Sequence, residues 1–194
     1  MAYPTVSAPY GLVPINLIGG QVYAGQVRHI PITSASGTDI FFGDVVALNT
    51  SGGSNVGIGH YALYSNTTAY GNTAVGYQAG YTNSTGTLNT FLGSYAGYAN
   101  TTSNNNSFVG SFAGYANTTG AQNTALGQAA LQNNTTASLN TGVGYQAGSA
   151  LTTGQENCLI GSAAGLGLPS GSYNTFVGRG TSTAAGYLVT TGSK

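Results

Sequence analysis

The sequence predicts an all-β protein: a small N-terminal β module followed by an eight-coil β-solenoid, or β-roll, of 17-residue repeats. Three observations indicate this fold class. Residues 55–179 repeat with a strict period of 17, the 194-residue chain holds 32 glycines, and the composition changes near residue 52. A unit of this length is too short for a pair of helices, and glycine at this density destabilises any helix. Each repeat is therefore expected to form one coil of a stack.

The N-terminal module spans residues 1–52 and has its own composition. Four of the five prolines lie in the first 31 residues. Apolar runs at 11–18, 26–32 and 40–48 predict three short β segments separated by glycine-rich turns. About fifty residues bury too little surface to be stable alone, so the module is expected to need a partner surface or further copies of itself. Serine and glycine at 51–54 predict a short flexible connection to the repeats.

The repeat, numbered from its leading asparagine as position 1, reads Asn-Thr-x-(aliphatic)-Gly-x-x-Ala-Gly-Tyr-x-Asn-Thr-Thr-Gly-x-x. Positions 1 and 5 hold asparagine and glycine in every copy, position 8 holds alanine until Thr181 ends the series, and no insertion or deletion interrupts the register. The residues that anchor the repeat are Asn72, Gly76, Ala79, Asn89, Gly93, Ala96, Asn106, Gly110, Ala113, Asn123, Gly127, Asn140 and Gly144.

Each recurring position has a physical reason. The aliphatic residue at position 4 and the alanine at position 8 are expected to form a thin core, because neighbouring coils bury what one coil leaves open. Glycine suits points where backbones approach closely or take a positive φ. The asparagines at position 1 are expected to stack as a ladder of amides. The Asn-Thr-Thr-Gly stretch at positions 12–15 predicts a turn with a left-handed glycine.

The far end of the chain departs from the pattern. At one coil per strand spacing of about 4.8 Å, eight coils predict a rod of roughly 40 Å. In the last copies Leu151, Leu166 and Leu168 replace polar or tyrosine residues, and Pro169 enters a turn. Terminal repeats cap the stack in repeat proteins. Residues 180–194 are accordingly expected to form a C-terminal cap or tail.

The charge content argues against several classes of partner. Three basic and three acidic side chains give a net charge of zero, whereas phosphate binding requires clustered basic residues. We therefore expect no nucleic-acid partner. A chain without net charge is repelled little by its neighbours, which favours a place inside an assembly. No apolar run approaches the ~20 residues that span a bilayer, and the N-terminus lacks the features of a signal peptide, so no membrane partner is expected.

The sequence offers no catalytic, cofactor or metal site, and we expect no enzyme activity. The two histidines, His29 and His60, lie in different segments and form no recognisable set with a serine and an aspartate. No aspartate recurs in the repeats, as a calcium-binding solenoid would require. Cys158 is the only cysteine, which excludes a disulfide within one chain. Its position in other repeats holds Thr, Ser or Val, so a packed small side chain is expected there.

Two outward columns are candidates for a surface function. Tyrosine recurs at position 10 of four successive repeats, as Tyr64, Tyr81, Tyr98 and Tyr115. Stacked aromatic side chains can contact sugar rings or a partner protein, and packing between neighbouring chains is the favoured interpretation. Threonine pairs recur at positions 13 and 14. An ice-binding array of these threonines is disfavoured, because consecutive residues of a strand point to opposite sides.

The opening of the chain resembles a known family. The stretch MAYPTVSAPYGLVPINLIGGQVYAGQVRHIPI, with GTDIFFGDVVAL after it, is similar to the start of small virion structural proteins of tailed bacteriophages, of the capsid-associated or decoration type. The resemblance covers about a quarter of the chain. It implies that residues 1–52 bind the major capsid protein or another virion protein.

The repeats carry a second resemblance. NTAVGYQAGYTNSTG, at residues 72–86, resembles repeats of phage fibres and, more distantly, the head repeats of trimeric autotransporter adhesins. Those head repeats are left-handed β-rolls assembled as trimers, although their unit is shorter. The resemblance implies that this chain is a homotrimer.

These observations favour a non-enzymatic phage virion structural protein, on the capsid surface rather than the tail. A capsid decoration, cement or head-fibre protein of this kind would dock through residues 1–52 and project a trimeric β-rod. Identical chains would bury their aliphatic and tyrosine columns together. The alternative is a tail-fibre or adhesin-type protein that recognises host surface glycans.

Overall fold

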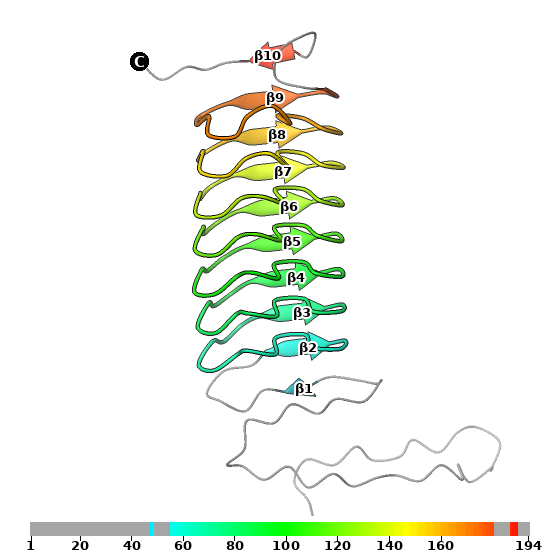
Figure 1. The fold of residues 1–194 in the computed structure, drawn as a ribbon, viewed down its shortest axis with the longest axis vertical. Coiled ribbons are helices and arrows are strands. Elements are labelled where there is room, and N and C mark those ends of the chain that lie inside the picture. The colour runs from blue at the N-terminus through cyan, green and yellow to red at the C-terminus, as the bar shows by residue number, and fades with distance from the viewer. Residues whose placement is uncertain (1–46, 49–54, 181–186, 190–194) are drawn as a thin grey trace, which may run out of the picture. The chain divides into compact units, whose positions relative to one another are not determined.

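The computed structural model describes residues 47–48, 55–180 and 187–189, all within the second of the chain's two units, Ser34–Lys194. These ranges contain ten short strands in one sheet and no helix (Figure 1). The predicted all-β solenoid with its 17-residue spacing is confirmed. The β segments expected at 11–18 and 26–32, and all of 40–48 except its last two residues, lie outside the described part of the chain.

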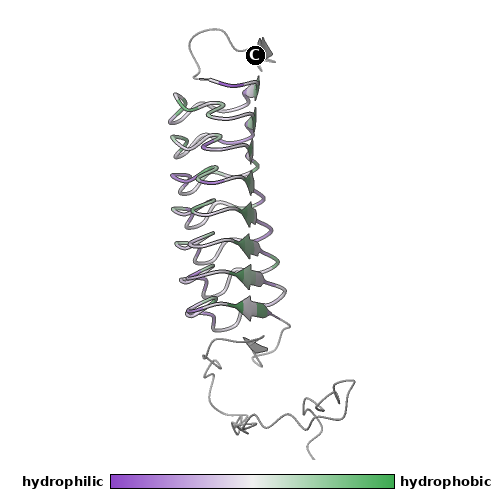
Figure 2. Cartoon of the chain, turned by 90° about the vertical axis from the view of Figure 1, so that its right-hand side faces the viewer, coloured by the Kyte–Doolittle hydropathy of each residue, from purple (hydrophilic) through white to green (hydrophobic). Residues whose placement is uncertain are grey.

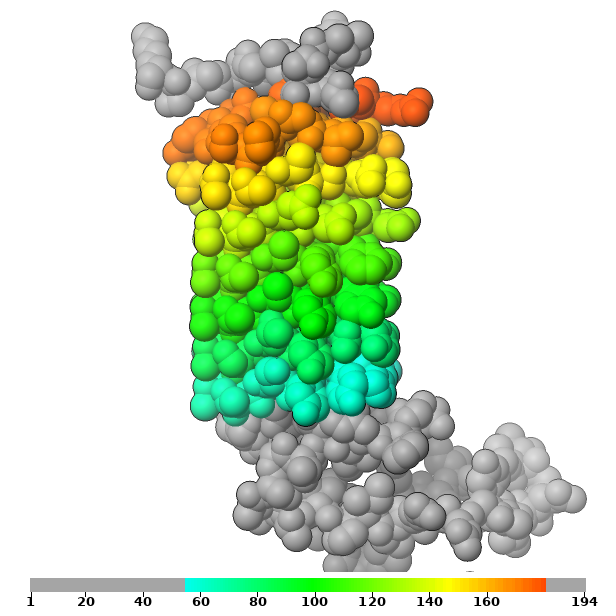
Figure 3. Space-filling model, viewed as in Figure 1, coloured from blue at the N-terminus to red at the C-terminus, as the bar shows by residue number. Residues whose placement is uncertain are grey.

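Eight of the strands recur once per coil. The strands are β1 (Ala47–Leu48), β2 (Val56–Ile58), β3 (Thr73–Val75), β4 (Thr90–Leu92), β5 (Ser107–Val109), β6 (Thr124–Leu126), β7 (Thr141–Val143), β8 (Cys158–Ile160), β9 (Thr175–Val177) and β10 (Tyr187–Val189). Strands β2 to β9 are parallel and pair residues 17 apart, as Thr90 pairs with Ser107, so seven turns separate these eight strands. Figure 3 shows the coils as closely packed bands that rise from cyan to orange.

Both ends of the parallel stack are closed by a strand that reverses direction. β1 pairs antiparallel with β2, and β10 pairs antiparallel with β9. The open edge of a parallel sheet would present unpaired N–H and C=O groups to other chains. β10 lies within the expected C-terminal cap, and its reversed pairing closes the last coil.

Each coil turns because four of its positions take a left-handed backbone. Position 5 is always glycine, with φ between 121° and 137°. In the seven complete coils, positions 7, 9 and 17 take φ between 48° and 70°, although most of their residues are not glycine. Such residues cost on the order of 1–2 kcal/mol each. Hydrogen bonds between coils offset this cost; the N–H of Gln78, for example, donates to the carbonyl of His60 at 2.8 Å.

The glycine at position 5 also marks the closest approach between coils. A Cβ on Gly93 would lie 2.6 Å from the carbonyl carbon of Gly110, and a Cβ on Gly110 would lie 2.5 Å from the carbonyl oxygen of Gly127. Real Cβ atoms do not approach backbone atoms this closely. The invariable glycine is therefore required by space as well as by φ.

The interior is lined by positions 3 and 8, which corrects one expectation. Ala79, Ala96 and Ala113 at position 8 are buried, as expected. The aliphatic residue at position 4 is not part of this core, because it points outward. Position 3 points inward instead, and Phe91 and Phe108 there are 0% exposed. Successive strand residues face opposite sides, and the buried asparagine at position 1 places positions 1 and 3 inside and positions 2 and 4 outside.

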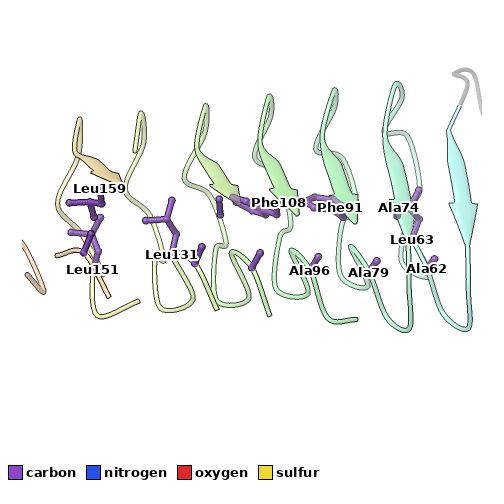
Figure 4. Packing of buried hydrophobic residues seen from close by; sticks show 14 residues of the cluster. Ala62, Leu63, Ala74, Ala79, Phe91, Ala96, Phe108, Leu131, Leu151 and Leu159 are labelled. Atoms are coloured by element: carbon purple, nitrogen blue, oxygen red, sulfur yellow. The ribbon is translucent and has the colours of Figure 1, made fainter. Parts of the chain in front are cut away.

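Side-chain volume inside the coil is balanced between positions 3 and 9. Phe91 leaves no room for a Cβ on Gly80 or Gly97, which would lie 2.5 and 2.3 Å from its ring. Where position 3 is Gly142, Leu131 fills the space, and its Cγ lies 2.9 Å from where a Cβ on Gly142 would be. Figure 4 shows these large buried side chains in one row along the stack. The core is therefore thin and continuous.

The expected ladder of asparagines at position 1 is present. The side-chain oxygen Oδ1 of each asparagine accepts the backbone N–H of the asparagine in the next coil, as Asn55 does from Asn72 at 2.8 Å and Asn123 from Asn140 at 3.0 Å. The amide Nδ2 donates across the same coil to position 15, where Asn55 reaches the carbonyl of Ala69 at 2.7 Å. Each buried asparagine thus ties its own coil together and joins it to the next.

A second ladder, at position 12, was not expected. The Nδ2 group of Asn100 donates to Oδ1 of Asn83 at 2.8 Å, that of Asn117 to Asn100 at 3.0 Å, and that of Asn134 to Asn117 at 3.1 Å. The glycine of this Asn-Thr-Thr-Gly stretch does not take the predicted left-handed φ; position 17 does. Position 15 requires a small residue for another reason: a Cβ on Gly120 would lie 2.1 Å from a carbonyl oxygen of the next coil.

Candidate functional site

The outer side of the sheet carries two straight columns of side chains, together termed the strand face. Position 4 presents an aliphatic residue in every coil: Ile58, Val75, Leu92, Val109, Leu126, Val143, Ile160 and Val177. Position 2 beside it presents Val56, Thr73, Thr90, Ser107, Thr124, Thr141, Cys158 and Thr175. Leu92 and Leu126 are 44% and 48% exposed. Figure 2 shows the hydrophobic colour recurring on the strands of successive coils.

The strand face is uncharged along its length. Within residues 55–180 the only charged side chains are Glu156 at position 17 and Arg179 at position 6, which belong to the columns on either side of the strand face. Single exposed apolar residues are common on soluble proteins, whereas a contiguous apolar patch indicates an interaction surface. The position 4 column of the strand face is such a patch, with one aliphatic residue in each coil.

A second surface is built from aromatic rings and is termed the aromatic surface. It consists of positions 6, 7 and 10 in the first four coils, with rings His60, Tyr61, Tyr64, Tyr77, Tyr81, Tyr95, Tyr98, Phe112 and Tyr115. The tyrosines at position 10 stack on one another, as the sequence predicts. Their ring centroids lie 5.2, 5.3 and 5.2 Å apart, with interplanar angles of 5°, 8° and 9°.

A second line of rings beside the tyrosine column was missed in the sequence. His60 stacks on Tyr77 at 5.4 Å, Tyr77 meets Tyr95 edge-on at 5.2 Å, and Tyr95 stacks on Phe112 at 5.0 Å. Positions 6 and 7 mix rings with serine and glutamine, so neither position alone shows an aromatic column. Reading the two positions together would have found it.

The stacked geometry limits what the aromatic surface can bind. Sugar rings bind aromatic residues by lying flat against an open ring face. In the position 10 column, both faces of Tyr81 and Tyr98 are covered by neighbouring tyrosines, so the open parts of these two rings are their edges and hydroxyl groups. Ring edges carry partial positive charge, and phenols donate hydrogen bonds. This surface therefore favours a partner that supplies hydrogen-bond acceptors.

Two phenols of the aromatic surface, those of Tyr81 and Tyr95, have a raised pKa. Desolvation among the other rings, and then the neighbouring phenols of Tyr64 and Tyr98, raise the pKa of Tyr81 above its usual value of 10.0. Desolvation also raises the pKa of Tyr95, with Tyr77 as the next cause. These two groups carry no charge near neutral pH.

The two threonines of each pair have different roles: the one at position 13 bonds to the next coil, and the one at position 14 faces solvent. At position 13 the hydroxyl donates to the backbone of the next coil, as Thr101 does to the carbonyl of Thr118 at 3.0 Å and Thr118 to that of Thr135 at 3.0 Å. At position 14 the threonines, such as Thr85 and Thr119, are exposed. Only one residue of each pair is thus available to a ligand, and the hydroxyl of the other holds the coils together.

Residues 55–180 present no cluster of His, Cys, Asp and Glu that could hold a metal ion. Cys158 is a free, half-buried thiol on the outer side of β8. His60 lies in the aromatic surface, stacked on Tyr77. No helix in the described ranges is long and apolar enough to cross a membrane. Comparisons with models of known protein families, with curated proteins and with solved structures find no match to this chain.

Proposed function

We propose that this chain is a structural protein of a tailed-phage particle. It acts as a capsid decoration or head-fibre protein, docks through residues 1–52, and projects a β-rod made of three identical chains. The observation that carries the proposal is the strand face, where one aliphatic residue per coil points outward, exposed in five coils and half-buried in the other three. Such a column favours a partner that packs against the strand face along the full length of the solenoid.

A second copy of the chain is the binding partner that fits the strand face best. The column repeats once per coil, at a rise of about 4.8 Å, and a partner must present groups at the same spacing to pack against every coil. An identical chain in parallel register does so by construction. Closed symmetric assemblies of identical chains are the common solution for soluble oligomers.

The positions of Glu156 and Arg179 support a trimer whose three-fold rotation axis runs along the strand face rather than beside it. A rotation axis brings the same residue of each chain to one level. At the column of Glu156 or of Arg179 it would gather three like charges, which is unfavourable in a desolvated interface. The strand face contains no charge, so the chains meet there without this penalty.

The proposed attachment to the particle is supported by the resemblance of the opening residues to virion structural proteins. A segment of about fifty residues that buries too little to stand alone is suited to folding on a partner's surface. The rods would then cement neighbouring shell subunits or extend from them.

The assembly is tested by light scattering on the full chain. We expect a molar mass near three times 19.4 kDa. Leu92→Lys with Leu126→Lys should lower this mass, because two charges per chain would be buried at the axis. The matched control is Thr85→Lys with Thr119→Lys, which adds the same charge at exposed position 14 and should leave the mass unchanged. A monodisperse wild-type monomer would contradict the trimer.

The location is tested on particles. Phage particles made without the chain should lose stability to heat or to chelators, or lose attachment to host cells, and should recover it when the purified chain is added. Particles that behave identically with and without the chain would contradict the proposed function.

A further inference from the structure

The aromatic surface is confined to one half of the solenoid. In coils 5 to 8 the same three positions hold residues such as Gln128, Ala129, Gln132 and Ser149, and the only ring among them is Tyr145. These coils keep the same strands and the same inter-coil hydrogen bonds, and coils 5 to 7 keep the same buried alanines. Rings at positions 6, 7 and 10 are therefore not needed to form a coil.

Contact between identical chains does not account for the rings either. In the proposed trimer the chains meet along the strand face, and that face runs through all eight coils. A contact needed for the whole rod would not stop after the fourth coil. The rings must serve a partner that reaches only the first half of the stack.

We infer that the aromatic surface is a second docking surface for the particle, binding the same shell protein as residues 1–52. This inference rests on the proposed function. Chain connectivity supports it, because the aromatic surface begins at His60, six residues after the end of the 54-residue stretch that precedes the first coil. Anchoring through residues 1–52 brings the first coils, before any others, to the surface of the shell.

The chemistry of the rings defines the partner. The aromatic surface carries no formal charge, and its outward groups are phenol donors and ring edges. A charged partner would lose its hydration without gaining an opposite charge. An uncharged protein surface with backbone or amide carbonyl groups accepts the phenol hydrogen bonds and packs against the ring edges. A glycan is a poorer fit, because the faces of the central rings are covered by their neighbours.

The test uses the full chain and shells of the phage made without it, with bound chain measured by sedimentation. Tyr81→Gln with Tyr98→Gln installs the residue that position 10 already carries in Gln132, so the coil is expected to fold. We expect about a tenfold or greater loss of affinity for the shells, since buried tyrosines are frequent hot spots. The control Tyr145→Gln, outside the aromatic surface, should bind like the wild type.

A second variant protects the test against misfolding. Tyr81→Phe with Tyr98→Phe keeps the stack and removes only the hydroxyl donors, and it should weaken shell binding by a few-fold. Molar mass and circular dichroism of all variants should match the wild type.

The outcomes separate the two proposals. Equal binding of the wild type and of the Tyr81→Gln, Tyr98→Gln variant overturns the aromatic docking surface and leaves the virion function intact. A wild type that does not bind shells at all overturns both. Shell binding unchanged but attachment to host glycans lost in the variant would assign the surface to a sugar and overturn the inference.

Discussion

The first four coils and the last four share one backbone and fill it differently. Coils 1 to 4 fill the core with Leu63, Phe91 and Phe108 and carry rings outside, whereas coils 5 to 8 fill it chiefly with Leu131, Leu151 and Leu159, with Phe176 packed against them, and leave the outside nearly free of rings. The left-handed positions and the parallel register are the same in both halves. The backbone is therefore specified by a few positions, chiefly the asparagine at 1, the glycine at 5 and the alanine at 8. The side chains at the remaining positions can therefore differ between the two halves without changing the backbone.

The halves also differ in their second asparagine ladder. It runs through the first coils and stops after Asn134, because position 12 of the next coil is Leu151. The Oδ1 atom of Asn134 is buried and has no hydrogen-bond partner among the described residues, and at the other end both amide atoms of Asn66 are in the same situation. A buried polar group without a partner costs about 1–3 kcal/mol. Interrupting a ladder thus carries its cost at the two ends.

The largest expected effect comes from the position shared by both halves. Gly110→Ala should destabilise the chain by more than about 3 kcal/mol, because a positive φ and a backbone clash act together. Gly178→Ala is the matched control: its φ is 129°, and no described atom lies within 4 Å of the added Cβ. It should cost only about 1–2 kcal/mol. Equal midpoints of urea unfolding for the two variants would show that close approach between coils does not limit this position.

A medium effect should separate the middle of the second ladder from its end. Asn117→Leu removes donors to Asn100 and to Gly120 and the acceptor of Asn134, and it should cost about 2–3 kcal/mol. Asn134→Leu extends the leucine column of Leu151 and removes one unpaired oxygen, but it leaves the buried Oδ1 of Asn117 without its donor, so it should cost about 1 kcal/mol, less than Asn117→Leu. Chemical denaturation of both variants measures the difference. A larger loss in Asn134→Leu would mean that the ladder is not cooperative.

The smallest effect should be a dependence on alkaline pH that arises in the first half. The pKa of Tyr81 and that of Tyr95 are raised in the folded chain. Unfolded tyrosines therefore lose their protons first, so stability should be constant below about pH 10 and should fall above it. Tyr81→Phe with Tyr95→Phe should flatten this fall in thermal melts between pH 8 and 11, and Tyr145→Phe should not. Identical pH profiles for all three proteins would contradict the assignment.

The sequence alone predicts the coil but not which residues face its interior. The fixed period and the glycine at position 5 predict a stack of β coils. The recurring asparagine at position 1 predicts the ladder of amides between them. The inward side of the strand was predicted wrongly because position 3 varies from Gly57 to Phe91, while position 4 is uniformly aliphatic. A uniformly apolar column usually indicates a core, and here it lies on the surface of the single chain. Only the folded structure shows that a large side chain at position 3 is accompanied by a small one at position 9, and the reverse.

A candidate surface could be predicted from the sequence only where the same residue type recurs at one position of the repeat. The tyrosine column at position 10 recurs at one position and was found. The rings at positions 6 and 7 alternate between two neighbouring positions and were not. Asn-Thr-Thr-Gly is also a common turn sequence, so the sequence predicts a turn there and not a second asparagine ladder. Its side-chain oxygens prove to pair between coils, which a sequence read one coil at a time does not reveal.

The reversed strands at the two ends have a consequence for how such a protein can change over generations. Because each coil bonds only to the coil before it and the coil after it, duplicating or deleting 17 codons inside the stack would leave both terminal hairpins, β1 with β2 and β9 with β10, intact. Recombination between near-identical repeats could therefore lengthen or shorten the molecule in steps of about 4.8 Å. The number of 17-codon repeats in the gene therefore sets the length of the solenoid.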